Sequence, residues 1–186
     1  MTSKLVVIGT SLGGFSALKL ILGKLPPAFP VPIAIVQHRH KESQTALAGY
    51  LQPLIPLPIR EVEDKDEIAP GAIYLAPADY HLLVEPGYFT LTTDEPVSYA
   101  RPSIDVLFES AADIYRDRTV GIILTGANQD GARGAAAIKA QGGRVIVQAP
   151  STAESPVMPE AAIAATQVDA IVPLTAISTT LLKYFS

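Results

Sequence analysis

The clearest fold signal in the chain is the stretch Lys4-Leu-Val-Val-Ile-Gly-Thr-Ser-Leu-Gly-Gly14. A short apolar run rich in β-branched residues, 5–8, leads into glycines, and an apolar stripe at helical spacing follows. This order predicts a buried strand, a tight turn and an amphipathic helix. Within the turn, residues 9–13 match the G-x-S-x-G pattern of a nucleophile elbow and place Ser11 at its centre. Ser11 is the candidate nucleophile, because a helix that begins just after it would point unpaired N–H groups at a developing oxyanion.

The length and composition of the chain favour one compact domain. The chain has 186 residues, of which 48% are hydrophobic, enough for a substantial core. A net charge of −4 argues against non-specific binding of nucleic acid, and the absence of cysteine excludes disulfides and thiolate metal sites. No signal peptide precedes the first strand, and no apolar run is long enough to span a membrane. We therefore expect a single soluble, cytoplasmic domain over residues 1–186.

Further apolar runs alternate with helical patterns along the chain. The runs are residues 33–36, 73–75, 120–124, 145–147 and 171–172, and the helical patterns cover 15–25, 104–114 (with Ser103 as the cap) and 134–140. Such alternation predicts an α/β fold with a doubly wound, mainly parallel sheet flanked by helices. Residues 81–91 differ, because two extended runs flank Pro86-Gly87, which predicts an inserted antiparallel β-hairpin. The proline-rich residues 53–58 suggest an exposed connector.

Three of the predicted strands are followed by residues of types that take part in catalysis. They are Ser11, His38 and Asp130, the last in a loop. The carboxyl ends of parallel strands meet in one crevice, so a hydroxyl, an imidazole and a carboxylate are expected to meet there. These are the parts of a Ser-His-Asp hydrolase. Each residue also has a structural interpretation, as a turn former, a helix cap or a loop histidine. His40 and His81 are alternative bases.

Other ligand classes fit less well. The glycines do not match the dinucleotide pattern G-x-G-x-x-G, and no lysine follows Gly14 as a phosphate loop requires. The pair His38-x-His40 lacks a partner carboxylate at metal-ligand spacing, so no metal is expected. Binding of an anionic ligand at the helix start, without catalysis, stays open as an alternative.

Several long motifs in order resemble the catalytic domain of the bacterial chemotaxis protein-glutamate methylesterase family. VVIGTSLGG (residues 6–14) is similar to the family's nucleophile turn, IAIVQHRH (33–40) to its I-V-Q-H segment, and LTGANQDGARG (124–134) to its L-T-G-M-G-x-D-G-A-x-G segment. IYLAPADYHLLVE (73–85), RPSIDVLFESAA (101–112) and MPEAA (158–162) also match family stretches. The resemblance covers almost the whole chain and implies the roles of nucleophile for Ser11, base for His38 and triad acid for Asp130.

The resemblance also implies a reaction and its partners. Family members hydrolyse glutamate methyl esters on the cytoplasmic helices of methyl-accepting chemoreceptors and deamidate particular receptor glutamines, without a cofactor. The elbow pattern makes the Leu12 N–H one oxyanion donor, and the family analogy makes the Ala127 N–H the second. Arg101 is expected either to contact acidic receptor residues or to brace the helix that begins near Ser103. Met158 is a tentative substrate contact in a loop, with packing as the alternative.

The chain departs from the family pattern at several positions. Arg39-His40 replace Met-Pro, which alters the rim of the site. Asn128 stands where a glycine is usual, so we expect backbone angles there that asparagine tolerates only partly. The nucleophile strand begins at Lys4, which leaves no space for the receiver domain that most family members carry. We therefore expect either an excised or stand-alone catalytic domain, or control by a separate regulatory protein. Two alternatives to the methylesterase remain: an impaired module that still binds receptors or chemosensory partners, and an esterase for small esters.

Overall fold

A computed structural model describes residues 4–42 and 46–185. Its centre is a seven-stranded sheet in the order β3-β4-β2-β1-β7-β8-β9, with every neighbouring pair parallel. The prediction of a doubly wound parallel sheet is confirmed. The strands are β1 (Leu5–Thr10), β2 (Ile33–Gln37), β3 (Ile59–Glu61), β4 (Ile73–Leu75), β7 (Thr119–Ile123), β8 (Arg144–Gln148) and β9 (Ala170–Val172).

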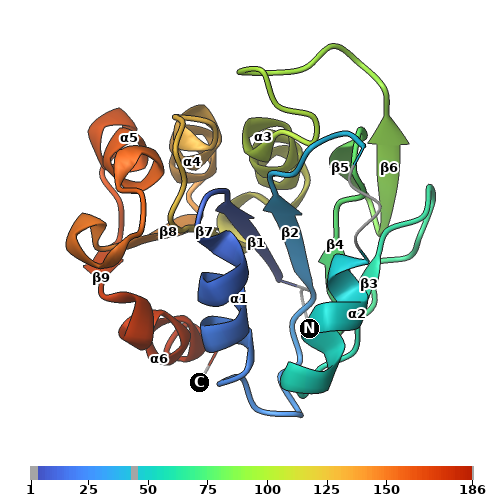
Figure 1. Cartoon of the computed structure of the whole chain (residues 1–186), viewed down its shortest axis with the longest axis horizontal. Helices are drawn as coiled ribbons and strands as arrows, with labels where there is room; N and C mark the ends of the chain where they lie inside the picture. Colours follow the sequence, from blue (N-terminus) through green and yellow to red (C-terminus); the bar gives the residue numbers. More distant parts are fainter. Residues whose placement is uncertain (1–3, 43–45, 186) are drawn as a thin grey trace.

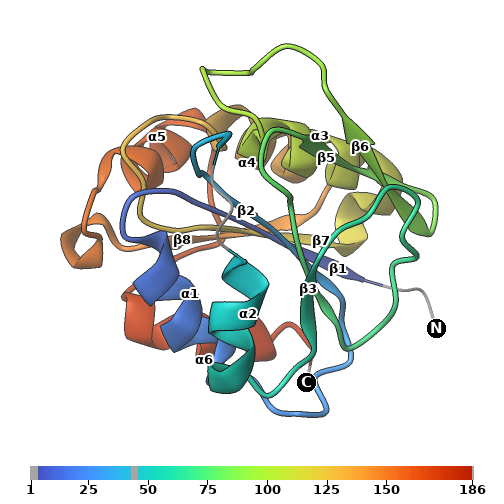
Figure 2. The ribbon, with the colours of Figure 1, turned by 45° about the vertical axis from the view of Figure 1, so that its right-hand side comes forward.

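Helices cover both faces of this sheet (Figures 1 and 2). On one face lie α3, α4 and α5, and on the other α1, α2 and α6, which gives three layers (Figure 2). The helices are α1 (Gly14–Leu22), α2 (Leu47–Leu51), α3 (Ile104–Tyr115), α4 (Ala132–Ala140), α5 (Val157–Ala165) and α6 (Ile177–Leu182). None of the helices in the described ranges has the length and apolar character that crossing a bilayer requires.

The apolar side chains form two cores, one on each face of the sheet. Alternate residues of β1 separate between them: Leu5 and Val7 face the α3–α4–α5 side, and Val6 and Ile8 face the α1–α6 side. This alternation follows from the two-residue period of a strand. Because both faces are buried, the strand reads as a continuous apolar run, which is why the sequence signalled it so clearly.

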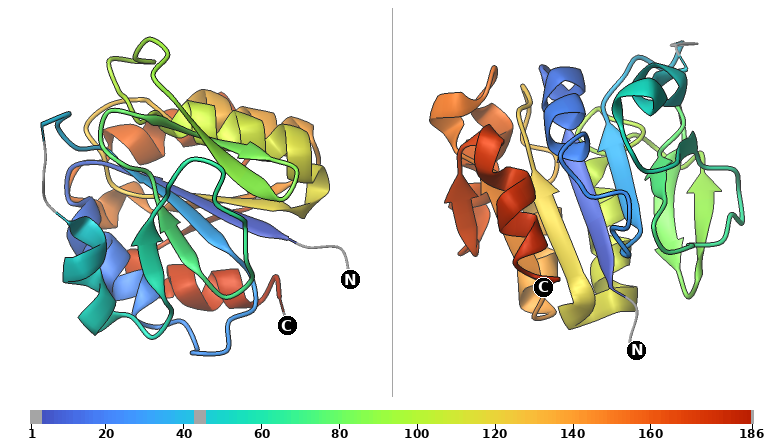
Figure 3. Two further views of the ribbon diagram at one scale, coloured as in Figure 1. Left: turned by 90° about the vertical axis from the view of Figure 1, so that its right-hand side faces the viewer. Right: turned by 90° about the horizontal axis from the view of Figure 1, so that it is seen from below.

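The predicted hairpin is confirmed and stands apart from the main sheet. Strands β5 (His81–Glu85) and β6 (Tyr88–Thr92) pair antiparallel around the Pro86-Gly87 turn. They lie alongside α3 (Figure 3), where the Val84 N–H donates to Ser110 Oγ at 3.0 Å. A long loop leads from β6 to α3 and projects above the carboxyl ends of the strands (Figure 1).

Four elements were not predicted: β3, α2, α5 and α6. Residues 53–58 are not simply an exposed connector, because Ile55 and Leu57 are buried and the chain continues into edge strand β3. Helices α2 and α6 also escaped prediction, since five or six residues carry too little periodicity to distinguish a helix from a loop. Ser178 in α6 donates to the carbonyl of Ile21 at 2.8 Å and so ties this helix to α1.

Candidate active site

Three adjacent strands bring the candidate residues to one edge of the sheet. β1 lies between β2 and β7, with Thr10 opposite Gln37 and Gly9 opposite Ile123. Residues that follow these strands therefore emerge side by side. Ser11 follows β1, His38 follows β2 and the 124–131 loop follows β7. From the centre of the sheet the strands run outward as β1, β2 and β4 on one side and as β7, β8 and β9 on the other. The order reverses between β1 and β7, which makes this edge the topological switch point at which α/β proteins bind ligands.

Hydrogen bonds from both neighbouring strands fix the turn that carries Ser11. The Ser11 N–H donates to the carbonyl of Thr125 at 2.9 Å, and Gln37 Nε2 donates to the carbonyl of Ser11, also at 2.9 Å. Gly13, the residue before α1, has φ 81°, a left-handed conformation that glycine adopts without steric cost. The turn is thus locked in a shape that presents the Ser11 side chain at the sheet edge.

Ser11 and His38 line the same pocket, together with Leu12, Gly14 and Phe15 at the start of α1. Ser11 is half-buried, and the pocket opens to solvent. Within the part of the chain that the structure describes, the Leu12 and Ala127 N–H groups have no hydrogen-bond acceptor. Leu12 lines the pocket with Ser11, whereas Ala127 is not among the residues that line it.

His38 is joined to Asp130 across the sheet edge. Its Nε2 donates to Asp130 Oδ2 at 2.6 Å, a short charge-assisted contact. The His38 side chain is 12% exposed, while the Asp130 side chain is completely buried. Because Nε2 is engaged by the carboxylate, Nδ1 is the ring nitrogen left to accept a proton from another group.

Asp130 has three further donors, all at the beginning of α3. Ser103 Oγ and the Asp105 N–H donate to Oδ1 at 2.9 and 3.0 Å, and the Ile104 N–H donates to Oδ2 at 2.7 Å. Burial by itself would raise the pKa of Asp130. Hydrogen bonds from His38, Asp105 and Ile104, with the charge on protonated His38, outweigh burial and lower its pKa below the ordinary value. Asp130 therefore stays ionised where it contacts the imidazole.

Asp105, in α3, accepts hydrogen bonds from the beginning of the next helix, α4. Its Oδ1 accepts the Gly131 and Gly134 N–H groups at 3.0 and 2.7 Å, at the beginning of α4. Gly134 permits this close approach, since a Cβ there would lie 2.5 Å from Phe108 Cβ. Burial and the neighbouring Asp130 charge raise the pKa of Asp105 to about 6, although the Gly134 and Gly131 N–H groups and Arg133 oppose the change.

The two alternative histidines lie in different surroundings. His81 is buried: its Nδ1 accepts the Ser103 N–H at 3.1 Å, and its Nε2 donates to the carbonyl of Glu95 at 3.0 Å. Both ring nitrogens are thus used within the fold. His40 is largely exposed, and its Nδ1 lies 4.0 Å from Glu42. Asp130 contacts neither of them, whereas it contacts His38 directly.

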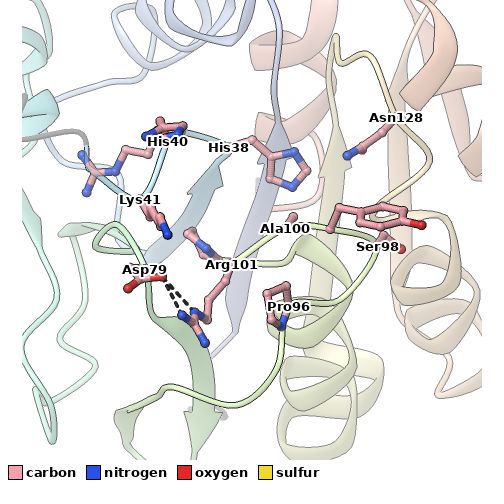
Figure 4. A pocket seen from close by; sticks show the side chains of 12 residues that line it. His38, His40, Lys41, Asp79, Pro96, Ser98, Ala100, Arg101 and Asn128 are labelled. Carbon is pink, nitrogen blue, oxygen red and sulfur yellow. Dashed lines mark hydrogen bonds and ion pairs between the residues drawn. The ribbon is translucent and has the colours of Figure 1, made fainter.

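Arg101 and Met158 are the two residues expected to contact the substrate. Arg101 lines a second pocket beside His38, but its guanidinium donates to Asp79 Oδ1 at 2.7 and 3.0 Å and to the carbonyls of Thr93 and Asp94 at 2.9 and 3.0 Å (Figure 4). It braces the loop before α3. Met158 lies in the first turn of α5, not in a loop, and is completely buried.

Asn128 fits its position without the glycine-like backbone that the resemblance led us to expect. Its φ is not positive, and its Oδ1 accepts the Asp130 N–H at 3.1 Å. The Asn128 side chain thus helps to hold Asp130, whose carboxylate is buried, in place. Asn128 also lines the second pocket with His38 and Arg101.

Several positioning residues were not recognised from the sequence. Gln37 and Thr125 hold the Ser11 turn, and Thr125 Oγ1 also donates to the carbonyl of Leu12 at 2.8 Å. Ser103 was predicted as a cap, and its Oγ does accept the Val106 N–H, but its bond to Asp130 was unforeseen. Gln37 and Ser103 lie inside the quoted motifs, which was the available signal. Within residues 4–42 and 46–185, no three histidine or carboxylate side chains group as metal ligands.

Comparison with known proteins identifies close relatives of this arrangement. Residues 6–181 match the family model described as CheB methylesterase. A Leptospira interrogans protein is 47% identical over 175 residues, covering 94% of this chain and 91% of that protein. A Thermotoga maritima protein-glutamate methylesterase/protein-glutamine glutaminase is 36% identical, covering 93% of this chain but 52% of its own length. The crystal structure of the Thermotoga maritima CheB methylesterase catalytic domain superposes with a TM-score of 0.95 at 35% identity, over 99% of this chain and all of that one.

Proposed function

Because the chain belongs to the CheB methylesterase family, we propose that it hydrolyses glutamate methyl esters on proteins and deamidates glutamine side chains. The name of the Thermotoga maritima relative gives both activities. The observation that carries the proposal is the 2.6 Å contact between His38 Nε2 and buried Asp130, beside a pocket that Ser11 shares with His38. The substrates that we propose are the cytoplasmic helices of methyl-accepting chemoreceptors.

In the proposed mechanism Ser11 Oγ attacks the ester carbonyl while His38 Nδ1 accepts its proton. Asp130 holds a proton on Nε2, which leaves Nδ1 as the atom that accepts the serine proton, and Asp130 then stabilises the imidazolium that forms. The tetrahedral oxyanion is bound by the Leu12 and Ala127 N–H groups. Such donors contribute about 3–4 kcal/mol each to transition-state stabilisation in other hydrolases.

Collapse of the tetrahedral intermediate breaks the ester C–O bond, and methanol leaves with the proton from Nδ1. Water then enters, gives a proton to Nδ1 and attacks the acyl-enzyme, which releases the glutamate side chain and restores Ser11. Deamidation follows the same steps, with ammonia as the leaving group. No step requires a cofactor.

Replacing Ser11 tests this proposal directly. We expect Ser11→Ala to abolish methanol release from a methylated receptor fragment, because no covalent intermediate can form, while the thermal unfolding midpoint stays near that of the wild type. Ser16→Ala is the matched control, since Ser16 is exposed and lines the same pocket. Turnover by Ser11→Ala equal to wild type would remove Ser11 from the mechanism.

The same assay separates the alternatives. Binding of the receptor fragment without methanol release by wild-type protein would favour an impaired binding module. Hydrolysis of p-nitrophenyl acetate without any action on the receptor would favour an esterase for small esters. The pocket with its linked imidazole and carboxylate supports hydrolysis over binding alone.

A further inference from the structure

The loop between β6 and α3 contains a strained two-residue turn. Val97 and Ala100 exchange backbone hydrogen bonds of 3.0 and 2.9 Å, which close the turn around Ser98 and Tyr99. Both central residues have positive φ, 50° and 62°. Turns of this type favour Asn-Gly because positive φ is unfavourable for residues with larger side chains. A tyrosine at the second position is therefore a costly choice for the turn itself.

Tyr99 gains nothing from packing that would offset this strain. It is the most exposed large apolar side chain in the part of the chain that the structure describes, with essentially its whole surface in solvent. None of the ring-stacking or cation–π contacts found among the described residues includes it. Strained residues persist only where the surrounding structure holds them in place, and they cluster at functional sites.

The turn stands at the edge of the candidate active site. Tyr99, His38 and Asn128 line one pocket of about 550 Å³. Figure 4 shows Ser98 and Asn128 on one side of His38, with His40 and Lys41 on the other. The pocket adjoins the one that contains Ser11, because His38 lines both. A polypeptide that places a side chain on Ser11 would have neighbouring residues close to Tyr99.

The strained turn is held in place from beneath. Arg101 ties its C-terminal side to Asp79 and to the carbonyls of Thr93 and Asp94. Buried His81 donates to the carbonyl of Glu95 on its N-terminal side. The loop is therefore a braced support that presents one aromatic ring. An aromatic side chain held this way loses little conformational entropy on binding, which is why tyrosine is frequent among residues that dominate binding energy.

We infer that Tyr99 is a substrate-contacting residue that selects protein-borne esters, by packing its ring on the polypeptide that flanks the reacting glutamate. The inference rests on the proposed function. A small ester fills only the pocket at Ser11 and does not reach the turn. A folded substrate does reach it and buries the ring, so Tyr99 contributes to recognition of large substrates.

The test compares a large and a small substrate in the same variants. We expect Tyr99→Ala and Tyr99→Gly to lower the ratio of kcat/KM for a methylated chemoreceptor fragment to kcat/KM for p-nitrophenyl acetate about tenfold, through a higher KM for the receptor, as for a strong interface residue. Tyr99→Gly relieves the positive φ, so its melting temperature should equal or exceed that of the wild type. Tyr50→Ala, an exposed tyrosine on α2, is the control. An unchanged ratio in both Tyr99 variants would overturn the inference.

A binding measurement keeps this outcome separate from failure of the proposed function. Should wild-type protein release no methanol, the receptor fragment is titrated calorimetrically into Ser11→Ala and Ser11→Ala/Tyr99→Gly. Binding that weakens about tenfold in the double variant supports Tyr99 as the contact even without turnover. Equal affinity in the two variants, or no binding to either, overturns the inference.

Discussion

Asp130 illustrates how one side chain serves structure and chemistry together. A completely buried carboxylate is costly unless donors surround it. Here four donors do so: the His38 ring, the Ser103 hydroxyl and the N–H groups of Ile104 and Asp105. The same hydrogen bonds that lower the pKa of Asp130 fix its position opposite His38. The charge needed beside an imidazolium is thus maintained by the beginning of α3.

Replacing Asp130 by asparagine should affect both roles. The amide NH₂ of Asp130→Asn would face either the Ile104 or the Asp105 N–H, and one donor opposite another costs about 1–3 kcal/mol of stability. Loss of the negative charge should lower kcat by about 10⁴-fold, as in a well-studied triad. Steady-state kinetics and urea unfolding measure the two effects.

An exposed aspartate provides the control for this experiment. Asp117→Asn, on the short turn after α3, should leave kcat and stability near wild type. A loss of kcat smaller than tenfold in Asp130→Asn would show that another group orients His38.

At the scale of elements, α3 and α4 cap one another. Asp130 precedes α4 but accepts N–H groups at the beginning of α3, while Asp105 lies in α3 and accepts N–H groups at the beginning of α4. Each carboxylate lies at the positive end of a helix dipole, where negative charge is favoured. The exchange locks the two helices at the sheet edge and determines the position of Asp130, the proposed triad acid.

This pairing predicts a pH dependence of stability. The pKa of Asp105 rises from an ordinary 3.8 to about 6 on folding, so between these values the native state binds more protons than the unfolded state. Stability should therefore fall as pH rises from about 4 to 6, by on the order of 2–3 kcal/mol. Asp105→Asn keeps the acceptor oxygen and removes the titration. Its stability relative to wild type should increase between pH 4 and pH 7.

Urea unfolding across this pH range measures the difference, and Asp113→Asn on the exposed face of α3 controls for the loss of one charge. Asp130 acts in the opposite direction: its lowered pKa gives stability that is present above about pH 4 and is lost as pH falls through its folded pKa. The two effects therefore occupy different pH windows. Parallel pH profiles for wild type and Asp105→Asn would exclude the raised pKa.

At the scale of the whole molecule, one sheet supports both cores. β1 and β7 lie at its centre and contribute side chains to each face. The α1–α6 layer cannot lose its packing without exposing the back of the strands that carry Ser11 and Asp130. The two layers are therefore expected to depend on each other for stability.

We predict that the chain unfolds in a single cooperative transition. Calorimetric and van't Hoff enthalpies should agree, and far- and near-UV circular dichroism should report the same midpoint. Two resolved transitions would show that the layers fold independently, contrary to the shared sheet.

Prediction from sequence succeeded where neighbours along the chain carry the information. The runs at β1 and β2 and the Pro86-Gly87 turn each depend on a few consecutive residues, and each was found. β3 and α6 were missed because three and six residues are too short for a periodic pattern. The resemblance assigned the roles of base and acid to His38 and Asp130, whereas the residue pattern alone left His40 and His81 open as bases.

Every strand except β3, the helices α1, α3 and α4, and the Ser11 turn could be derived from the sequence, because apolar periodicity and glycine turns are local properties of the chain. The quoted motifs indicated the family. Three arrangements became apparent only from the tertiary structure. Asp130 caps α3, Arg101 braces a loop, and Tyr99 lines the same pocket as His38. These contacts join loop residues that lie far apart along the chain. Loops carry no periodic signal, so the packing of helices and strands on the sheet alone brings such residues together.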